Sequence, residues 1–105
     1  RRARVIFGRG RFGDLVRRQL DLFEEDEVEL LQEAETAARA YDEAERDDAE
    51  EAYGDYLLVV ESVVESLEEL RDTYAGTLDD DSRDAYEQAF SRAARKRFPK
   101  LTAGL

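Results

Sequence analysis

Carboxylates spaced one helical turn apart are the residues of this chain best placed to do chemistry. Glu61, Glu65 and Glu68 have this spacing in the middle of the chain, and Glu24 and Glu27 have it nearer the start. Paired carboxylates of this kind hold metal ions in helical bundles when histidines complete the ligand set. The chain contains no histidine, and no EF-hand loop spacing occurs. We therefore predict no metal site, no cofactor and no catalytic residue.

Cysteine is also absent. This excludes disulfides, thiolate nucleophiles and zinc–sulfur sites, while the lack of histidine removes the commonest general base. No nucleophile–base pair, phosphate loop or cofactor fingerprint can be assembled from the remaining residues. The sequence therefore favours a protein that acts by binding rather than by catalysis.

Arginines suited to phosphate binding are concentrated in the opening segment, RRARVIFGRGRFGD. Arginines contact phosphates, Phe7 and Phe12 could stack on bases, and glycines let a backbone conform to a ligand. Arg17 and Arg18 also begin a predicted helix, where positive charge opposes the helix dipole and favours an external anion. The candidate phosphate contacts are Arg1, Arg2, Arg4, Arg9, Arg11, Arg17 and Arg18. The alternative is that this arm docks on acidic helices of its own or a partner subunit.

Charge is segregated along the chain. Residues 1–18 hold seven arginines and one acid, residues 19–91 hold 26 acids and four arginines, and residues 92–105 hold five cations and no acid. The net charge is −11. Such blocks bear on partners and self-association rather than on fold. The acidic residues 19–91 could attract a basic protein. We favour the simpler interpretation that they form a solvated helical surface.

Helical periodicity predicts three helices, at about residues 14–46, 48–75 and 80–97. Asp14 suits an N-cap of the first helix, and Gly76 suits the end of the second. The third begins in an acidic run and ends in a basic run before Pro99, as the helix dipole prefers. The second helix carries an apolar arc wide enough to contact two neighbours, so we expect it to be the central element.

Glu27 falls inside the apolar stripe of the first predicted helix. An unpaired buried carboxylate is strongly destabilising. Three options stay open: Glu27 pairs with Arg71 or Arg83, the helix breaks near Asp26, or the carboxyl has a raised pKa of functional use.

These elements predict an all-α fold, a long antiparallel helical hairpin plus a third helix forming a three-helix bundle. Residues 1–13 are expected to form a flexible basic Gly/Arg arm, residues 14–98 a single domain and residues 99–105 a tail. The long first helix has more apolar surface than one neighbour covers, so we predict a symmetric dimer. The expected interaction surface is Tyr53, Tyr56, Val60, Val64 and Leu67.

We expect a non-enzymatic protein–protein interaction or scaffolding module that forms a homo-oligomer and has an unidentified protein partner. Nucleic-acid binding through the arginine/glycine arm is the alternative. No run of about 18 apolar residues is present, so no membrane span is predicted. No signal peptide is visible, which favours a cytoplasmic location. Fourteen arginines against two lysines, with no asparagine, are typical of a GC-rich bacterial genome.

Overall fold

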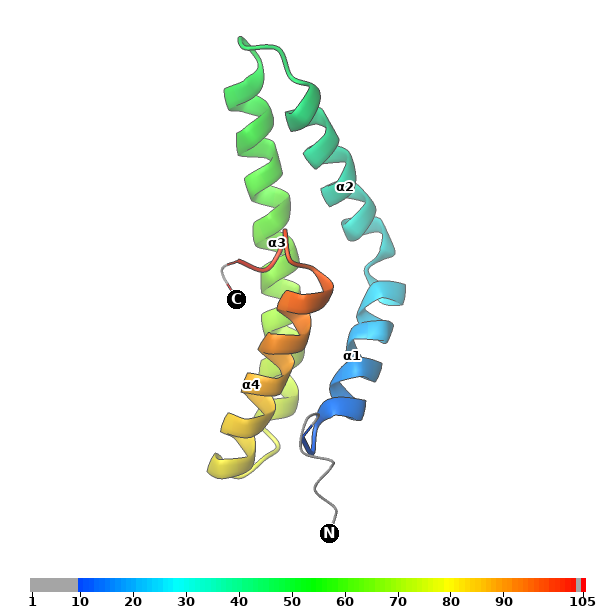
Figure 1. The fold of residues 1–105 in the computed structure, drawn as a ribbon, viewed down its shortest axis with the longest axis vertical. Coiled ribbons are helices and arrows are strands. Elements are labelled where there is room, and N and C mark those ends of the chain that lie inside the picture. The colour runs from blue at the N-terminus through cyan, green and yellow to red at the C-terminus, as the bar shows by residue number, and fades with distance from the viewer. Residues whose placement is uncertain (1–9, 104) are drawn as a thin grey trace.

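The structure, a computed structural model, describes residues 10–103 and 105. Across these residues the chain forms four α-helices and no strand, which confirms the predicted all-α class (Figure 1). The helices are α1 (Gly13–Asp26), α2 (Val28–Glu43), α3 (Ala49–Ala75) and α4 (Asp80–Arg97).

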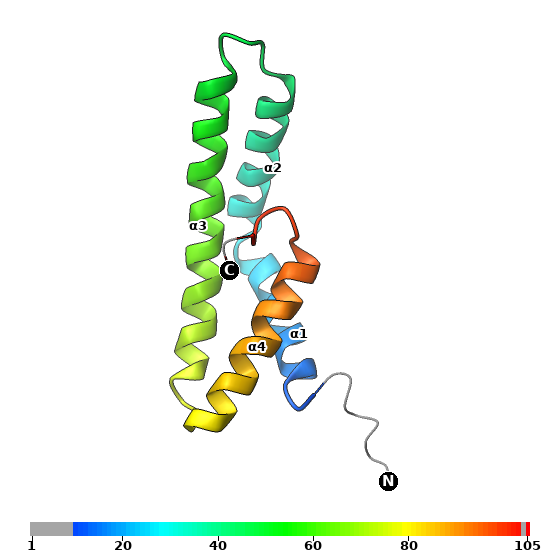
Figure 2. The same cartoon turned by 60° about the vertical axis from the view of Figure 1, so that its left-hand side comes forward.

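The helices are arranged so that the two ends of the molecule differ in thickness. The helices α1 and α2 follow one another along one side, α3 returns antiparallel to them, and α4 runs back beside only one half of α3 (Figures 1 and 2). The helix α2 packs against α3, whereas α4 packs against both α1 and α3. A three-helix part and a two-helix end therefore share an elongated molecule of 60 × 26 × 22 Å.

The predicted first helix at 14–46 is interrupted, so the described chain has four helices instead of three. Glu27 leaves helical geometry at φ −110° and ψ 31°, although its N–H still donates to the Phe23 carbonyl at 2.8 Å. The last turn of α1 carries acids and no cation, which opposes the helix dipole and favours an end there. The break also lets α1 pack along α4 while α2 packs along α3. Of the three options for Glu27, the structure therefore shows the break.

Neither predicted arginine partner reaches the half-buried Glu27. Arg71 forms an ion pair with Asp72 at 2.9 Å, and Arg83 forms one with Asp80 at 3.0 Å. Both arginines instead hold α4 against the C-terminal half of α3, as described below.

The core is confined to the three-helix part. Nearly all of its members lie in or beside α1, α4 and the second half of α3: Phe12, Val16, Leu20, Phe23, Ala34, Val63, Leu67, Ala75, Tyr86, Phe90, Ala94 and Phe98. From Glu35 to Ser62, a range described throughout, no residue is buried. We call residues 35–62 the hairpin end.

Both segments flanking the predicted domain contain buried residues. Phe12, placed in the predicted arm, packs edge-to-face on Tyr86 with ring centroids 5.5 Å apart. Thr102, placed in the predicted tail, is completely buried, and its hydroxyl donates to the Phe98 carbonyl at 2.7 Å. The rest of the predicted arm, residues 1–9, lies outside the described residues.

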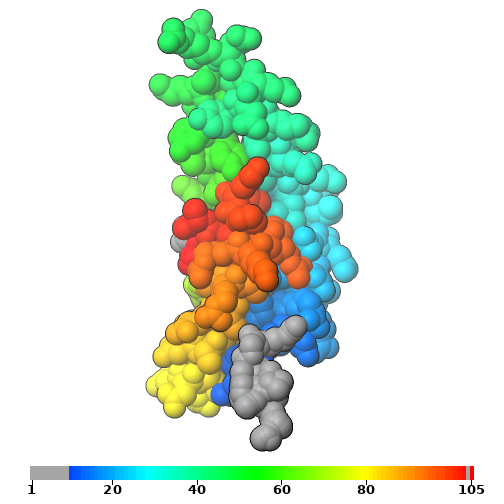
Figure 3. All heavy atoms as spheres, in the orientation of Figure 1, coloured from blue at the N-terminus to red at the C-terminus, as the bar shows by residue number. Residues whose placement is uncertain are grey.

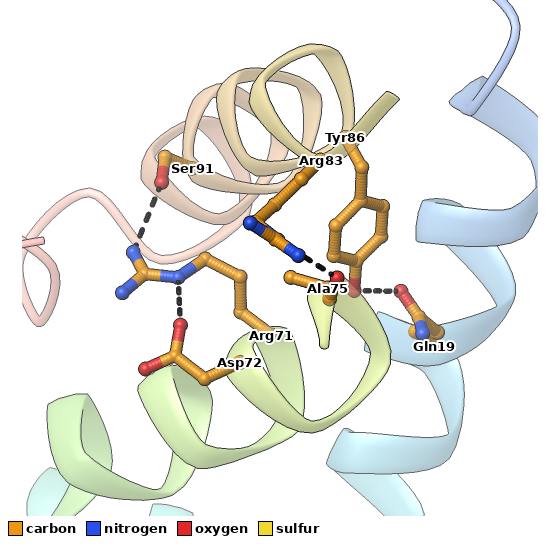
Figure 4. Close-up of polar contacts among 7 residues, drawn as sticks. All are labelled: Gln19, Arg71, Asp72, Ala75, Arg83, Tyr86 and Ser91. Atoms are coloured by element: carbon orange, nitrogen blue, oxygen red, sulfur yellow. Dashed lines mark hydrogen bonds and ion pairs between the residues drawn. The ribbon is translucent and has the colours of Figure 1, made fainter. Parts of the chain in front are cut away.

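Polar contacts fix α4 in the three-helix part (Figure 4). The Tyr86 hydroxyl donates to Gln19 Oε1 on α1 at 2.8 Å, and Arg71 on α3 donates to Ser91 Oγ at 3.4 Å. Arg83 donates to the Ala75 carbonyl at 3.2 Å and to the Leu78 carbonyl at 3.0 Å, so it connects α4 to the end of α3 and to the turn that follows it. These bonds connect α4 to both neighbours in the half of the molecule that it covers.

Because of Tyr86, the stability of the fold should change with pH in the alkaline range. Burial raises the pKa of the Tyr86 hydroxyl from 10.0 to about 12, because the phenolate would lose hydration. Stabilisation from a raised pKa is complete below pH 10 and is lost as the pH rises towards 12. We expect the free energy of unfolding to fall across this window, and to fall less in a Tyr86→Phe variant. Urea unfolding followed by circular dichroism at several pH values tests this, and equal losses in both proteins would contradict it.

Candidate interaction surfaces

One face of α3 runs through both halves of the molecule but is covered in only one of them. Eighteen residues make five α-helical turns. Tyr53 therefore lies on the same face as Arg71, and Leu57 lies on the same face as Ala75. In the three-helix part this face contacts α4, and Ala75 is 2% exposed. In the hairpin end Tyr53 and Leu57 are 45% and 43% exposed.

A cluster of tyrosines borders this uncovered stretch. Tyr41 on α2 lies 5.1 Å from Tyr53 and 6.4 Å from Tyr56, measured between ring centroids. The Tyr56 hydroxyl donates to the Lys100 carbonyl at 3.5 Å, so the segment after α4 reaches the inner edge of the cluster. We call the exposed residues Tyr41, Tyr53 and Leu57 the tyrosine face. Beyond the C-terminal segment, the hairpin end is formed by α2 and α3 alone (Figure 3).

The predicted interaction residues of α3 divide between surface and core. Tyr53 is exposed, and Tyr56, Val60 and Val64 are half-buried. Leu67 is fully buried, so it belongs to the core and not to an accessible surface.

Tyr41 and Leu57 complete the exposed face and were not among the predicted interaction residues. The spacing of four residues from Tyr53 to Leu57 places them on one helix face, and that signal was present in the sequence.

Acidic residues surround the tip beyond the tyrosine face. Residues 42–51, which end α2, form the turn and begin α3, include one arginine, Arg46. The same segment contains seven exposed acids, and we call these the acidic tip: Asp42, Glu43, Glu45, Asp47, Asp48, Glu50 and Glu51. The hairpin end thus presents aromatic and apolar side chains next to a strongly negative surface.

A groove of opposite charge lies between α1 and α4 in the three-helix part. Its volume is about 480 Å³ and it is lined by Gly13, Val16, Arg17, Leu20, Ala89, Arg92, Ala93, Lys96 and Arg97. We call this the basic groove, because cations from both helices line it above an apolar floor.

The cations of the basic groove differ in how they are paired. Arg97 donates to Asp21 at 2.7 Å and to Glu24 at 3.0 Å. Arg17 pairs with Asp14 across exposed side chains, an arrangement that contributes little stability. Within residues 10–103 and 105, Arg92 and Lys96 form no ion pair. These two cations on α4 therefore remain open to an external anion.

The three predicted phosphate contacts that the structure describes do not all line the basic groove. Arg17 lines the basic groove, whereas Arg11 donates to Ser82 Oγ at 2.8 Å and stacks on the Phe12 ring at 5.0 Å. Arg18 is exposed on α1 and is not part of the groove lining. The remaining four predicted contacts, Arg1, Arg2, Arg4 and Arg9, lie outside the described residues.

In the described part of the chain, no three acidic side chains are grouped so that they could hold a metal ion. The same residues form no helix with the length and apolar character needed to cross a membrane. The chain matches no protein-family model, no curated protein and no solved structure. The surfaces of the described residues that could contact a partner are the tyrosine face, the acidic tip and the basic groove.

Proposed function

We propose that this chain is a non-enzymatic protein–protein interaction module that pairs with a second copy of itself through the tyrosine face. One observation carries the proposal: α4 covers a face of α3 in the three-helix part and leaves the same face open around Tyr53 and Leu57. Removing a large apolar side chain from water stabilises a complex by about 1.5–3 kcal/mol. That range is for complete burial of a fully exposed side chain, and Tyr53 and Leu57 are 45% and 43% exposed, so covering each of them contributes somewhat less than half of it.

The chemistry of the face supports a specific interface. Tyrosine is enriched in interfaces because it buries a large ring at low conformational-entropy cost and keeps a polar group at the edge. Tyr41 and Tyr53 already contact one another, so part of the ordering is complete before a partner arrives. A symmetric dimer is the commonest assembly for a soluble protein with one self-associating surface.

Leu57→Glu tests this function, and Leu58→Glu is its matched control. Leu57 lies on the tyrosine face, whereas Leu58 is 64% exposed and is turned about 100° around α3. A carboxylate placed in an apolar interface loses hydration, so we expect Leu57→Glu to weaken dimerisation about 100-fold. Leu58→Glu should leave it unchanged. Sedimentation velocity over a dilution series measures both, and a parent chain that stays monomeric would refute the proposal.

Polyanion binding is a second candidate function, favoured by the cations gathered in the basic groove. Such binding should weaken steeply with salt, since each phosphate contact releases counterions. Fluorescence anisotropy with a labelled single-stranded oligonucleotide measures this. If the chain binds polyanions, the oligonucleotide should bind to the parent, and Arg92→Glu or deletion of residues 1–9 should abolish that binding. The deletion keeps Phe12, so it leaves the core intact. The interaction module predicts no binding at physiological salt.

A further inference from the structure

We infer that the acidic tip and tyrosine face of one copy dock in the basic groove of a second copy, with each dimer containing two such contacts. The inference rests on the proposed function and names the surface that receives the tyrosine face. The tyrosine face with the acidic tip lies in the hairpin end, and the basic groove lies in the three-helix part of the same chain.

Charge decides between this arrangement and contact of one hairpin end with another. A tip-to-tip dimer would bring two sets of seven exposed acids together, and like charges placed close to one another oppose association. The basic groove presents Arg92 and Lys96 without ion-pair partners among the described residues. Contact between acidic tip and basic groove joins opposite charges.

The apolar chemistry agrees with the charges. Val16 and Leu20 on α1 and Ala89 and Ala93 on α4 form the floor of the groove. The two alanines are short, so the floor of this open groove leaves room for a side chain of a partner. An aromatic ring such as that of Tyr53 can rest on this floor beside a guanidinium, an arrangement that cation–π attraction favours.

The shape of the molecule allows both contacts to form at once. The basic groove belongs to the three-helix part and the acidic tip to the far end of the hairpin (Figures 1 and 2). Two copies lying antiparallel place the thinner hairpin end of each beside the thicker three-helix part of the other. The second copy then covers the face of α3 that α4 leaves open. A two-fold axis closes this assembly as a dimer, whereas a single head-to-tail contact would propagate into a filament.

Complementation between two defective variants tests the inference. In the proposed contact Leu57 rests on the apolar floor of the groove and not beside its cations, so a carboxylate at position 57 loses hydration and Leu57→Glu lacks a working tyrosine face. The double variant Arg92→Glu with Lys96→Glu lacks a working groove. We expect the groove variant to dimerise about 10- to 100-fold more weakly than the parent.

Each contact in a homodimer of either variant has one defective side. A heterodimer has one intact contact, where the tip and tyrosine face of the groove variant meet the groove of Leu57→Glu. Mixing should therefore give association that is tighter than that of either variant alone and weaker than that of the parent. Labelled Leu57→Glu, sedimented with and without the unlabelled groove variant, gives the readout.

A matched control separates groove chemistry from net charge. Arg18→Glu with Arg95→Glu reverses two exposed cations that do not line the groove, so it should dimerise like the parent. Neutral Arg92→Gln with Lys96→Gln should weaken the dimer in the same direction by a smaller factor. Circular dichroism establishes that each variant keeps the helical content of the parent.

The outcomes distinguish this inference from the function on which it rests. A groove variant that dimerises like the parent, while Leu57→Glu does not, overturns the inference and leaves the interaction module standing. A mixture that associates no more tightly than either variant alone also overturns it. If groove reversal abolishes oligonucleotide binding but leaves the dimer intact, the occupant of the groove is a polyanion and the inference is wrong. A monomeric parent refutes both.

Discussion

Replacing Phe90 with alanine is expected to lower the free energy of unfolding by about 3–5 kcal/mol. Phe90 is completely buried on α4, and its ring centroid lies 6.0 Å from that of Tyr86. Because α4 connects α1 to α3, the cavity would form where the three helices of the core meet. Urea unfolding followed by circular dichroism measures the change.

Leu22→Ala is the control for this measurement. Leu22 is 56% exposed on α1, so its truncation should change the free energy of unfolding by less than about 1 kcal/mol. A Phe90→Ala variant whose loss of stability resembles that of Leu22→Ala would show that α4 does not pack as described.

Truncating Leu67 and Leu57 in separate variants should have very different effects, although both are leucines on α3. Leu67 is fully buried beside α4, so Leu67→Ala should cost about 2–5 kcal/mol. Leu57 is 43% exposed where α4 no longer covers the helix, so Leu57→Ala should cost less than about 1 kcal/mol.

Unfolding of these two variants must be measured at a dilution where the parent is monomeric, because Leu57 also belongs to the proposed interface. Equal losses of stability would contradict the uneven coverage of α3. The same pair should reverse its order in a dimerisation assay performed on the folded proteins, with Leu57→Ala having the larger effect.

Local signals in the sequence were sufficient to predict the second half of the fold. The helix expected at about 48–75 spans Ala49–Ala75, and the helix expected at about 80–97 spans Asp80–Arg97. In α4 the Asp79 carboxylate accepts from the Ser82 N–H at 2.8 Å, and this bond holds the pKa of Asp79 below its usual value. This cap acts within one turn of helix, so sequence spacing reveals it. The predicted N-cap Asp14 is different: α1 begins at Gly13, and Asp14 lies in its first turn without capping the helix.

Features that depend on how the helices pack could not be predicted in the same way. The apolar arc of α3 has similar chemistry in both halves, so sequence alone could not separate buried Leu67 from exposed Tyr53. The division depends on where α4 ends. The break at Glu27 likewise reflects the different neighbours of α1 and α2.

The basic groove is another feature that could not be predicted from the sequence alone. Arg17 on α1 and Arg92 on α4 are far apart in the chain, and only the fold brings them to one groove. The sequence shows the basic run at the end of α4. Cations are favourable at the C-terminal end of a helix, so the run did not by itself indicate a binding site. Of the described residues that were predicted from sequence as interaction or phosphate contacts, only Tyr53 lies in the tyrosine face and only Arg17 lines the basic groove.

The mass of the unmodified protein in solution tests the central claim most directly. If the open face of α3 receives a second copy, sedimentation equilibrium should give twice the chain mass of 12.1 kDa, and Leu57→Glu should give 12.1 kDa under the same conditions. A mass of 12.1 kDa for the unmodified protein at every concentration would contradict the account.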